Sequence, residues 1–281
     1  MVILLFASEQ SEPAQGLFEP TKSFQKKSKP KRGDWLARFK ERSVTFKNYC
    51  ASDPVRPRPG DVLRFVPVGK FSEKDRALLK KTAEFAAIWF TLPVETTKDQ
   101  KLPVKGWQRE HMGSLQFRTA WFLDHLLPPF RKDNVVCVSG ITMEDLYPED
   151  GWNFVFGQAS LRSRVGVWSF ARLTGGDDTQ DLRRCCKIVV HEIGHMFGLE
   201  HCIRYECNMN GSNHLEETDR QPLHLCPDCL RKSAWNQKFD VVARYRKLGK
   251  FYAANGLKTE AAWIARRLAE LKTVPAAGAP D

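Results

Sequence analysis

The sequence predicts an α/β protein with a mixed, twisted β-sheet, and three observations support this prediction. Strand-like and helix-like patterns alternate in the order β-α-β-α-β between residues 61 and 138. Two more strand patterns follow, and after them comes a long helix with one apolar face. The chain has 281 residues, of which 42% are hydrophobic and 27% charged, an ordinary composition for a globular protein. We therefore expect one core domain with extensions at both ends.

Both ends differ in composition from the middle of the chain. Residues 1–33 combine lysines with prolines, which predicts a basic and mostly disordered arm. Residues 34–60 carry aromatic side chains and finish in a proline-rich stretch, which predicts an N-terminal strap or linker. We expect the core domain at residues 61–233, a helical extension at residues 234–272 and a tail at residues 273–281.

The charge of the chain is strongly basic. The formal net charge is +11, and the first 60 residues hold 12 Lys and Arg against 6 Asp and Glu. Such an arm can attract acidic partners, including nucleic acid, although a solvated linker is the simpler interpretation. The apolar run at residues 1–6 is too short for a secretion signal, and no stretch reaches the roughly 18 apolar residues of a membrane span. We expect an intracellular, cytoplasmic protein, with the nucleus as a further compartment and no membrane partner; the oligomeric state is left open.

The core domain divides into elements that can be placed in order. Residues 61–68 read as a strand, and Ser72 has the position of an N-cap for a helix that runs to about Phe90. A short strand over residues 92–94 is followed by a second helix over residues 114–127, which ends before Pro128. Residues 134–138 predict a buried strand, residues 143–147 a turn, and residues 152–156 and 165–171 two further strands. The long helix begins near Asp181, after a glycine-rich loop, and two C-terminal helices are expected at residues 234–250 and 259–272.

The long helix carries the residues that point to chemistry. On a helical wheel His191 and His195 share one face, one turn apart, and Glu192 lies at the edge of that face. Apolar side chains fill the opposite face, apart from Ile188 on the histidine side, so this back should pack on the sheet. Two imidazoles in this arrangement can bind one metal ion.

A third ligand is available just beyond the helix. Gly198 can adopt a positive φ, so the helix can end there and the chain can return His201 to the same ion. Three imidazoles bind Zn²⁺ and leave one position open, which is the arrangement of a catalytic zinc. In such a site a zinc-activated water attacks a carbonyl, and Glu192 serves as the general base and then as the acid. Histidines without a metal are the alternative, but that alternative leaves the shared face and the glycine unexplained.

Four of the eight cysteines form a second group with metal-ligand spacing. They are Cys202, Cys207, Cys226 and Cys229. Four thiolates make a closed tetrahedral zinc site, and a C-x₂-C pair is a common part of one. Buried cysteines used as small apolar residues and a redox C-x₂-C pair are the alternatives, and the polar surroundings favour the metal.

These motifs together resemble a known family. The pattern HExxHxxGxxH at residues 191–201, followed by the four cysteines and Met209, is similar to the archaemetzincin family of metzincin zinc metallopeptidases. The similarity is greatest to the archaemetzincin-2 type of eukaryotes, extends roughly over residues 34–271 and is densest from 145 to 232. Further matching stretches are residues 145–147, 153–157, 169–172, 211–217 and 225–230.

The resemblance implies a fold and an activity. It implies a metzincin-like domain with a mixed sheet, an active-site helix, a Met-turn that contains Met209, and a structural zinc on the four cysteines beside the catalytic zinc. It also implies peptidase or aminopeptidase activity on a peptide or protein substrate. By analogy with the clan, the strand at residues 165–171 would line the cleft and pair with the substrate.

Several other polar residues receive simpler interpretations. We expect His214 to be a local hydrogen-bond partner, and Glu216 and Glu217 to lie in a solvated turn rather than to bind a substrate amine. The main rival function is a zinc-stabilised binding protein with weak or no catalysis, whose basic surface would contact nucleic acid. The intact Glu192 favours the enzyme, because a binding protein has no use for a carboxyl group at that position.

Overall fold

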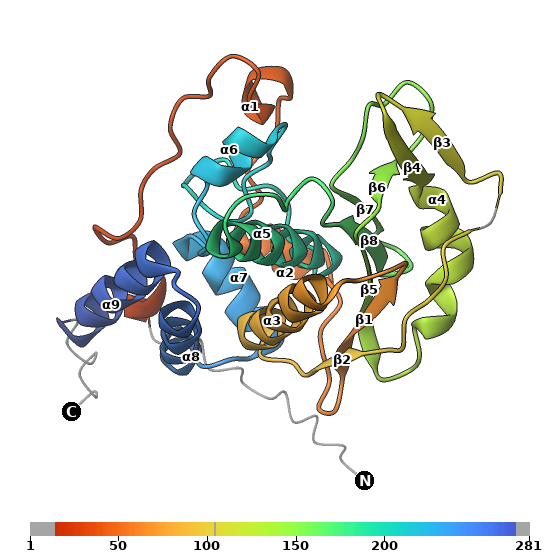
Figure 1. Ribbon diagram of the computed structural model, residues 1–281. Coiled ribbons are helices and arrows are strands. Elements are labelled where there is room, and N and C mark those ends of the chain that lie inside the picture. The colour runs from red at the N-terminus through yellow and green to blue at the C-terminus, as the bar shows by residue number, and fades with distance from the viewer. Residues whose placement is uncertain (1–14, 104, 274–281) are drawn as a thin grey trace, which may run out of the picture.

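A five-stranded sheet packed against one long helix forms the centre of the molecule (Figure 1). The computed structural model describes residues 15–103 and 105–273. The strand order is β2-β1-β5-β8-β7, in which only β7 runs antiparallel to its neighbour. The strands are β1 (Val62–Val68), β2 (Val94–Thr96), β5 (Val135–Thr142), β7 (Gly157–Ser160) and β8 (Val165–Ser169). The expected α/β class with a mixed sheet is confirmed.

The first helix of the core matches its sequence signal closely. It is α3 (Glu73–Phe90), and Ser72 caps it: the Ser72 side chain accepts from the Asp75 amide, and the Asp75 carboxylate accepts from the Ser72 amide. Its buried face packs against the long helix α5 (Asp178–Met196) and also against a later helix, where Phe85 meets Phe251 and Tyr252. Burial of this apolar stripe stabilises the helix within the core of the molecule.

Residues 114–127 are not one helix, so that prediction is wrong. Ser114–Arg118 is strand β4, which pairs with β3 (Gln108–His111) and β6 (Asp145–Tyr147) in a separate three-stranded sheet. Helical backbone starts only with α4 (Thr119–Trp121) and η2 (Phe122–Leu126), before the short turn η3 (Pro128–Phe130). The buried Gln116 side chain explains the strand, because its amide donates to Asp145 Oδ2 at 2.8 Å across the sheet. A helical pattern in the sequence cannot reveal a hydrogen-bond partner 29 residues away.

The strands around residue 150 also differ from expectation. The expected turn at residues 143–147 contains β6, and residues 152–156 are irregular apart from one bridge between Val155 and Leu146. The strand lies further along, at β7. A Cβ on Gly157 would overlap the Trp168 ring, so the backbone of β7 lies directly on that side chain. This close approach leaves no room for a side chain at residue 157.

The C-terminal part is helical, with one break that the sequence reading missed. Its helices are α6 (Leu215–Arg220), α7 (Pro227–Gln237), α8 (Val241–Ala254) and α9 (Lys258–Thr273). The expected helix over residues 234–250 is split, because Lys238 takes a left-handed conformation (φ 54°) and Asp240 caps α8. The last expected helix is confirmed as α9. Helices α8 and α9 lie on the far side of α5 from the sheet (Figure 1).

The N-terminal segment is packed against the domain over residues 15–33. It contains η1 (Gln15–Phe18), and the strap that follows contains α1 (Trp35–Arg38) and α2 (Phe46–Ala51). Phe24 is buried against Trp263 of α9, and the Lys27 amide donates to the Arg204 carbonyl at 3.1 Å. The expectation of a mostly disordered arm is therefore wrong for these residues, because an apolar anchor and backbone pairing outweigh the charge pattern. Residues 1–14 and the tail from 274 lie outside the described part.

Within residues 15–103 and 105–273, none of the helices combines the length and the apolar character that crossing a bilayer requires.

Candidate metal centres

Helix α5 begins with a strong cap and presents the expected histidine face. The Asp177 carboxylate accepts from the Thr179 and Gln180 amides at 2.9 Å, so the helix starts at Asp178 rather than near Asp181. The back of the helix is buried against the sheet and α3. The rigid core thus fixes the positions of the side chains on the front.

The structure brings the three histidines to one point. The ring nitrogens of His191, His195 and His201 that could bind a metal all lie within 4.8 Å of one another. Gly198 has φ +80°, and its amide donates to the His195 carbonyl at 2.8 Å, which ends the helix and returns the chain. His201 reaches the other two rings by this reversal, as the sequence predicted.

The hydrogen bonds of the rings show that the group fits a cation. Nδ1 of His191 lies 2.7 Å from the Asn208 carbonyl, and Nδ1 of His195 lies 2.6 Å from the Leu199 carbonyl. A carbonyl oxygen only accepts, so each Nδ1 carries the proton and each Nε2 presents a lone pair. The two Nε2 atoms are 3.0 Å apart, and lone pairs facing each other at that distance need a cation between them.

Burial keeps the three imidazoles neutral. It lowers the pKa of His191 to about 3, and it lowers the pKa of His195 and His201 to about 4. Neutral imidazole is the form that binds zinc. The same burial raises the pKa of Glu192, whose carboxyl makes no hydrogen bond or ion pair with any described residue. That carboxyl therefore stays available for proton transfer.

Three residues to which the sequence analysis gave no role border the histidine site. Glu41, from the strap, accepts from His201 Nδ1 at 2.7 Å, and together with Arg42 and Glu200 it lines a cavity of about 350 Å³ next to His195 and His201. No spacing rule joins residue 41 to residue 201, so only the fold could reveal this contact. A larger hollow of about 940 Å³, at the starts of α5 and α9, contains none of the three histidines.

The Met209 side chain packs against helix α5. A Cβ on Gly194 would come within 2.8 Å of the Met209 sulfur, so the side chain packs on the helix backbone between His191 and His195. Met209 is 1% exposed. Residue 208, next to it, supplies the carbonyl that holds His191. The loop over residues 207–210 therefore supports the histidine group from below.

The four cysteines form a second compact group. Their sulfur atoms lie within 4.8 Å of one another, and all four residues are buried. Cys207 Sγ accepts from the Met209 amide at 3.4 Å and from the Cys226 amide at 3.2 Å, and such N–H···S contacts suit thiolate ligands. Hydrogen bonds from the neighbouring cysteines, Cys207 first, lower the pKa of Cys202. This donor set fits a closed tetrahedral zinc site.

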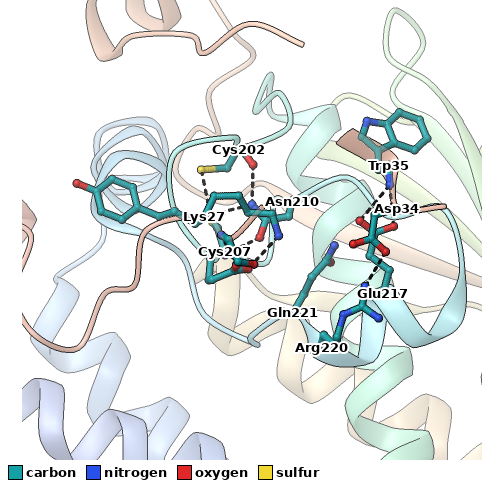
Figure 2. A network of polar contacts seen from close by, with 12 residues as sticks. Lys27, Asp34, Trp35, Cys202, Cys207, Asn210, Glu217, Arg220 and Gln221 are labelled. Atoms are coloured by element: carbon teal, nitrogen blue, oxygen red, sulfur yellow. Dashed lines mark hydrogen bonds and ion pairs between the residues drawn. The ribbon is translucent and has the colours of Figure 1, made fainter. Parts of the chain in front are cut away.

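Asn210 holds the loop that carries this group. Its Nδ2 donates to the Cys202 carbonyl at 2.5 Å and to the Tyr205 carbonyl at 2.9 Å, while its Oδ1 accepts from the Cys207 amide (Figure 2). These three hydrogen bonds of the Asn210 side chain all lie within residues 202–210. The loop is thus fixed from within.

The chain is similar to a known protein family over most of its length. A family model described as peptidase family M54 matches residues 119–234. Archaemetzincin-2 of Mus musculus is 35% identical over 289 residues, a match that covers 87% of this chain and 77% of that protein. The chain belongs to the archaemetzincin family.

Solved archaemetzincin structures share the central fold. The archaemetzincin of Methanopyrus kandleri has a TM-score of 0.53 at 30% identity, covering 65% of this chain and 99% of its own. That of Archaeoglobus fulgidus, complexed with malonate, has a TM-score of 0.51 at 28% identity, covering 61% of this chain and 99% of its own. The archaemetzincin family comprises metallopeptidases, and the histidine and cysteine groups of this member are consistent with zinc sites.

One expectation about the substrate cleft of this archaemetzincin-family chain is wrong. Strand β8, at the expected position, is hydrogen-bonded to β5 on one side and β7 on the other, so it has no free edge for a substrate. The two edge strands of this sheet are β2 and β7, and β7 packs near α5. The predicted strand was correct, but its place in the sheet follows from pairings that the sequence does not show.

The remaining candidate residues are structural. His214 caps α6 by accepting from the Glu217 amide at 3.2 Å, and Glu217 is buried, where it accepts from the Trp35 amide at 3.1 and 3.0 Å (Figure 2). Asp34 completes this cluster and binds Arg220 at 2.6 Å. Expecting a local role for His214 was correct, but Glu217 is not in a solvated turn. The exposed Glu216 pairs only with Arg220 among the described residues.

Proposed function

We propose that this archaemetzincin-family chain is a zinc-dependent aminopeptidase whose catalytic domain spans residues 61–233. His191, His195 and His201 hold the catalytic zinc, and Glu192 is the general base and acid. One observation carries the proposal: three Nε2 lone pairs converge beside a carboxyl group that no described residue engages.

The roles follow from the chemistry of each group. A bound zinc supplies a Lewis acid that polarises the scissile carbonyl and makes a water nucleophilic near neutral pH. Glu192 takes the proton of the attacking water and returns it to the leaving amine, a task that suits a carboxyl whose pKa is raised by burial. Gly198 sets the reversal, and Met209 supports the helix from below.

A second zinc on Cys202, Cys207, Cys226 and Cys229 is structural in this proposal. Four protein ligands leave no open position, so this site does no chemistry. Its location directly after His201 suits a role in fixing the catalytic loop.

Substrate placement is proposed from the topology. The free edge of β7 is the place where an extended peptide adds to the sheet. Glu200 is one of the residues that line the cavity beside His195 and His201, and its carboxylate would suit the ammonium group of a peptide N-terminus. This arrangement favours removal of N-terminal residues over internal cleavage.

Replacement of Glu192 tests the catalytic proposal. We expect Glu192→Gln to keep two zinc ions per chain and to lower kcat by about 10²–10⁴-fold, the usual contribution of a general base. Zinc content by atomic spectroscopy and hydrolysis of a peptide library are the measurements. The control is Glu84→Gln, which removes an exposed carboxylate from α3 and should leave both unchanged. A Glu192→Gln protein with wild-type kcat would refute the assignment.

The aminopeptidase preference has a separate test. Peptides with a free N-terminus should be shortened one residue at a time, while their N-acetylated counterparts should resist cleavage. Internal cleavage of acetylated peptides would show an endopeptidase instead.

The rival binding function receives less support from the structure. In the basic segment, Lys26 donates to the Tyr205 hydroxyl at 2.9 Å and Lys27 pairs with Glu206 at 3.0 Å. Part of its charge is therefore used within the molecule. If the protein with both zincs cleaved no peptide, and bound nucleic acid with a steep salt dependence mapped to residues 22–32, the rival would replace the enzyme.

A further inference from the structure

The third histidine is held differently from the other two. The Nδ1 atoms of His191 and His195 face backbone carbonyls of neighbouring loops. The Nδ1 of His201 instead lies 2.7 Å from the carboxylate of Glu41, a residue 160 positions earlier in the chain. The imidazole orientation of His201 therefore depends on a side chain of the N-terminal strap.

Glu41 is itself held in place. Its Oε1 also accepts from the indole Nε1 of Trp35 at 2.8 Å, and the Trp35 ring meets the His201 ring edge-on at 5.1 Å. Trp35 in turn packs flat on the Gly211 backbone, where a Cβ would overlap the indole. The carboxylate thus sits in a fixed frame rather than on a free surface loop.

The strap is anchored to the loop that follows Met209. The Trp35 amide donates to Glu217, and Asp34 binds Arg220 of α6 (Figure 2). The Asn213 side chain donates to the Gly33 carbonyl at 2.9 Å. These contacts tie the strap that carries Glu41 to residues 213–220, which follow the loop that contains Met209.

One oxygen of the Glu41 carboxylate has no hydrogen-bond donor among the described residues. Both donors reach Oε1, while Oε2 is buried and receives no hydrogen bond from the described residues. A buried carboxylate oxygen without a hydrogen-bond donor is costly. A divalent ion on the Nε2 side of His201 would supply the missing positive charge through the ring.

We propose that Glu41 is a positioning residue for the metal site: its carboxylate fixes the Nδ1–H tautomer and the ring angle of His201 and raises the basicity of Nε2. The N-terminal strap therefore completes the histidine site. This inference rests on the proposed assignment of the three histidines as metal ligands. Residues that hold metal-bound histidines in this way typically change metal affinity by about 10–100-fold.

Metal binding to the full-length chain tests the proposal without relying on catalysis. Wild type, Glu41→Ala and Glu41→Gln are titrated with zinc against a chelator, after the cysteine site has been filled. Glu84→Gln on α3 is the control for loss of one carboxylate. We expect about 10–100-fold weaker binding at the histidine site for Glu41→Ala, a smaller loss for Glu41→Gln, and no change for the control.

A spectroscopic readout separates positioning from general damage. Cobalt(II) at the histidine site should give a visible absorption band that shifts in Glu41→Ala, while the sulfur-to-metal bands of the cysteine site stay as in wild type. Wild-type affinity and spectrum in Glu41→Ala would overturn the proposal. If Glu41→Ala does not fold, the isosteric Glu41→Gln decides alone, and wild-type affinity in that variant would overturn it.

The failure of the underlying function would look different. A wild-type chain that binds no metal at the three histidines would refute the zinc-site assignment itself. A chain that binds zinc with Glu41-dependent affinity but cleaves no peptide would refute the peptidase proposal and leave the role of Glu41 intact.

Discussion

At the scale of single residues, the contact between Gly194 and Met209 fixes how closely the loop over residues 207–210 packs against helix α5. The glycine lies between the two helical histidines, and the methionine sulfur occupies the space where a side chain would be. Glycine costs helix stability, so its presence here needs a packing reason. The close approach of Met209 supplies that reason, and it makes residue 194 a sensitive position.

Gly194→Ala should destabilise the protein despite the better helix propensity of alanine. The new Cβ meets the Met209 sulfur at 2.8 Å in a buried site, and overpacking of this kind costs about 1–3 kcal/mol. Urea unfolding measures the loss, and Gly194→Ala should cost less in a Met209→Ala background, because the clash is removed there. A Gly194→Ala protein as stable as wild type would contradict this packing.

At the scale of elements, a buried acidic group joins the second sheet to the segment after β8. Asp145 of β6 accepts from Arg172 at 2.8 and 2.6 Å and from Gln116 of β4 at 2.8 Å. Burial raises the pKa of Asp145, but the hydrogen bonds from Arg172 and Gln116 outweigh it, so the pKa is lowered overall. The negative charge is therefore part of what holds β4, β6 and the end of β8 together.

Asp145→Asn should lower stability by about 1–3 kcal/mol at pH 7, because charge-assisted hydrogen bonds are lost. The native pKa lies below that of the unfolded chain, so the contribution is present above about pH 4 and disappears as the pH falls through the native pKa. The gap between wild type and variant in urea should accordingly close in acid. Asp150→Asn, at a side chain that is 96% exposed, is the control. A gap that stays constant down to pH 2 would argue against an ionic role.

At the scale of the whole molecule, the two metal groups share one piece of backbone. Cys202 follows His201 directly, its amide donates to the Met209 carbonyl at 2.7 Å, and the Asn208 carbonyl holds His191. The loop fixed by the cysteines therefore touches the histidine group at several points. A substitution in the cysteine group should therefore alter the geometry of the histidine group.

Cys226→Ser should lower peptidase activity at least tenfold although it removes no proposed catalytic ligand. Loss of one thiolate weakens the structural zinc, and the loop over residues 207–210 loses its fixed position. The measurements are kcat/KM and zinc content, which should fall from two ions toward one. Cys50→Ser, at a half-buried thiol outside the group, is the control. Full activity in a well-folded Cys226→Ser protein would reject the coupling.

Sequence patterns succeeded where the signal was local. The capping box at Ser72, the histidine face of α5 and the reversal at Gly198 each depend on residues within a few positions of one another. They failed where the partner was remote. Strand β4 was predicted to be helical because the contact between Gln116 and Asp145 forms only in the folded chain. The predicted helix over residues 234–250 is interrupted at Lys238, whose left-handed conformation the sequence does not signal with a glycine.

The sequence by itself determined which histidines and cysteines we propose as metal ligands, because metal chemistry needs particular side chains at spacings that a helix and one turn already provide. The tertiary structure alone decided what surrounds those ligands. It put β7 rather than β8 at an edge of the sheet, and it placed Glu41 against His201 and Phe24 against Trp263. The physical reason is that these contacts join segments more than a hundred residues apart or depend on strand pairing, and burial and hydrogen bonding select them only once the chain is compact.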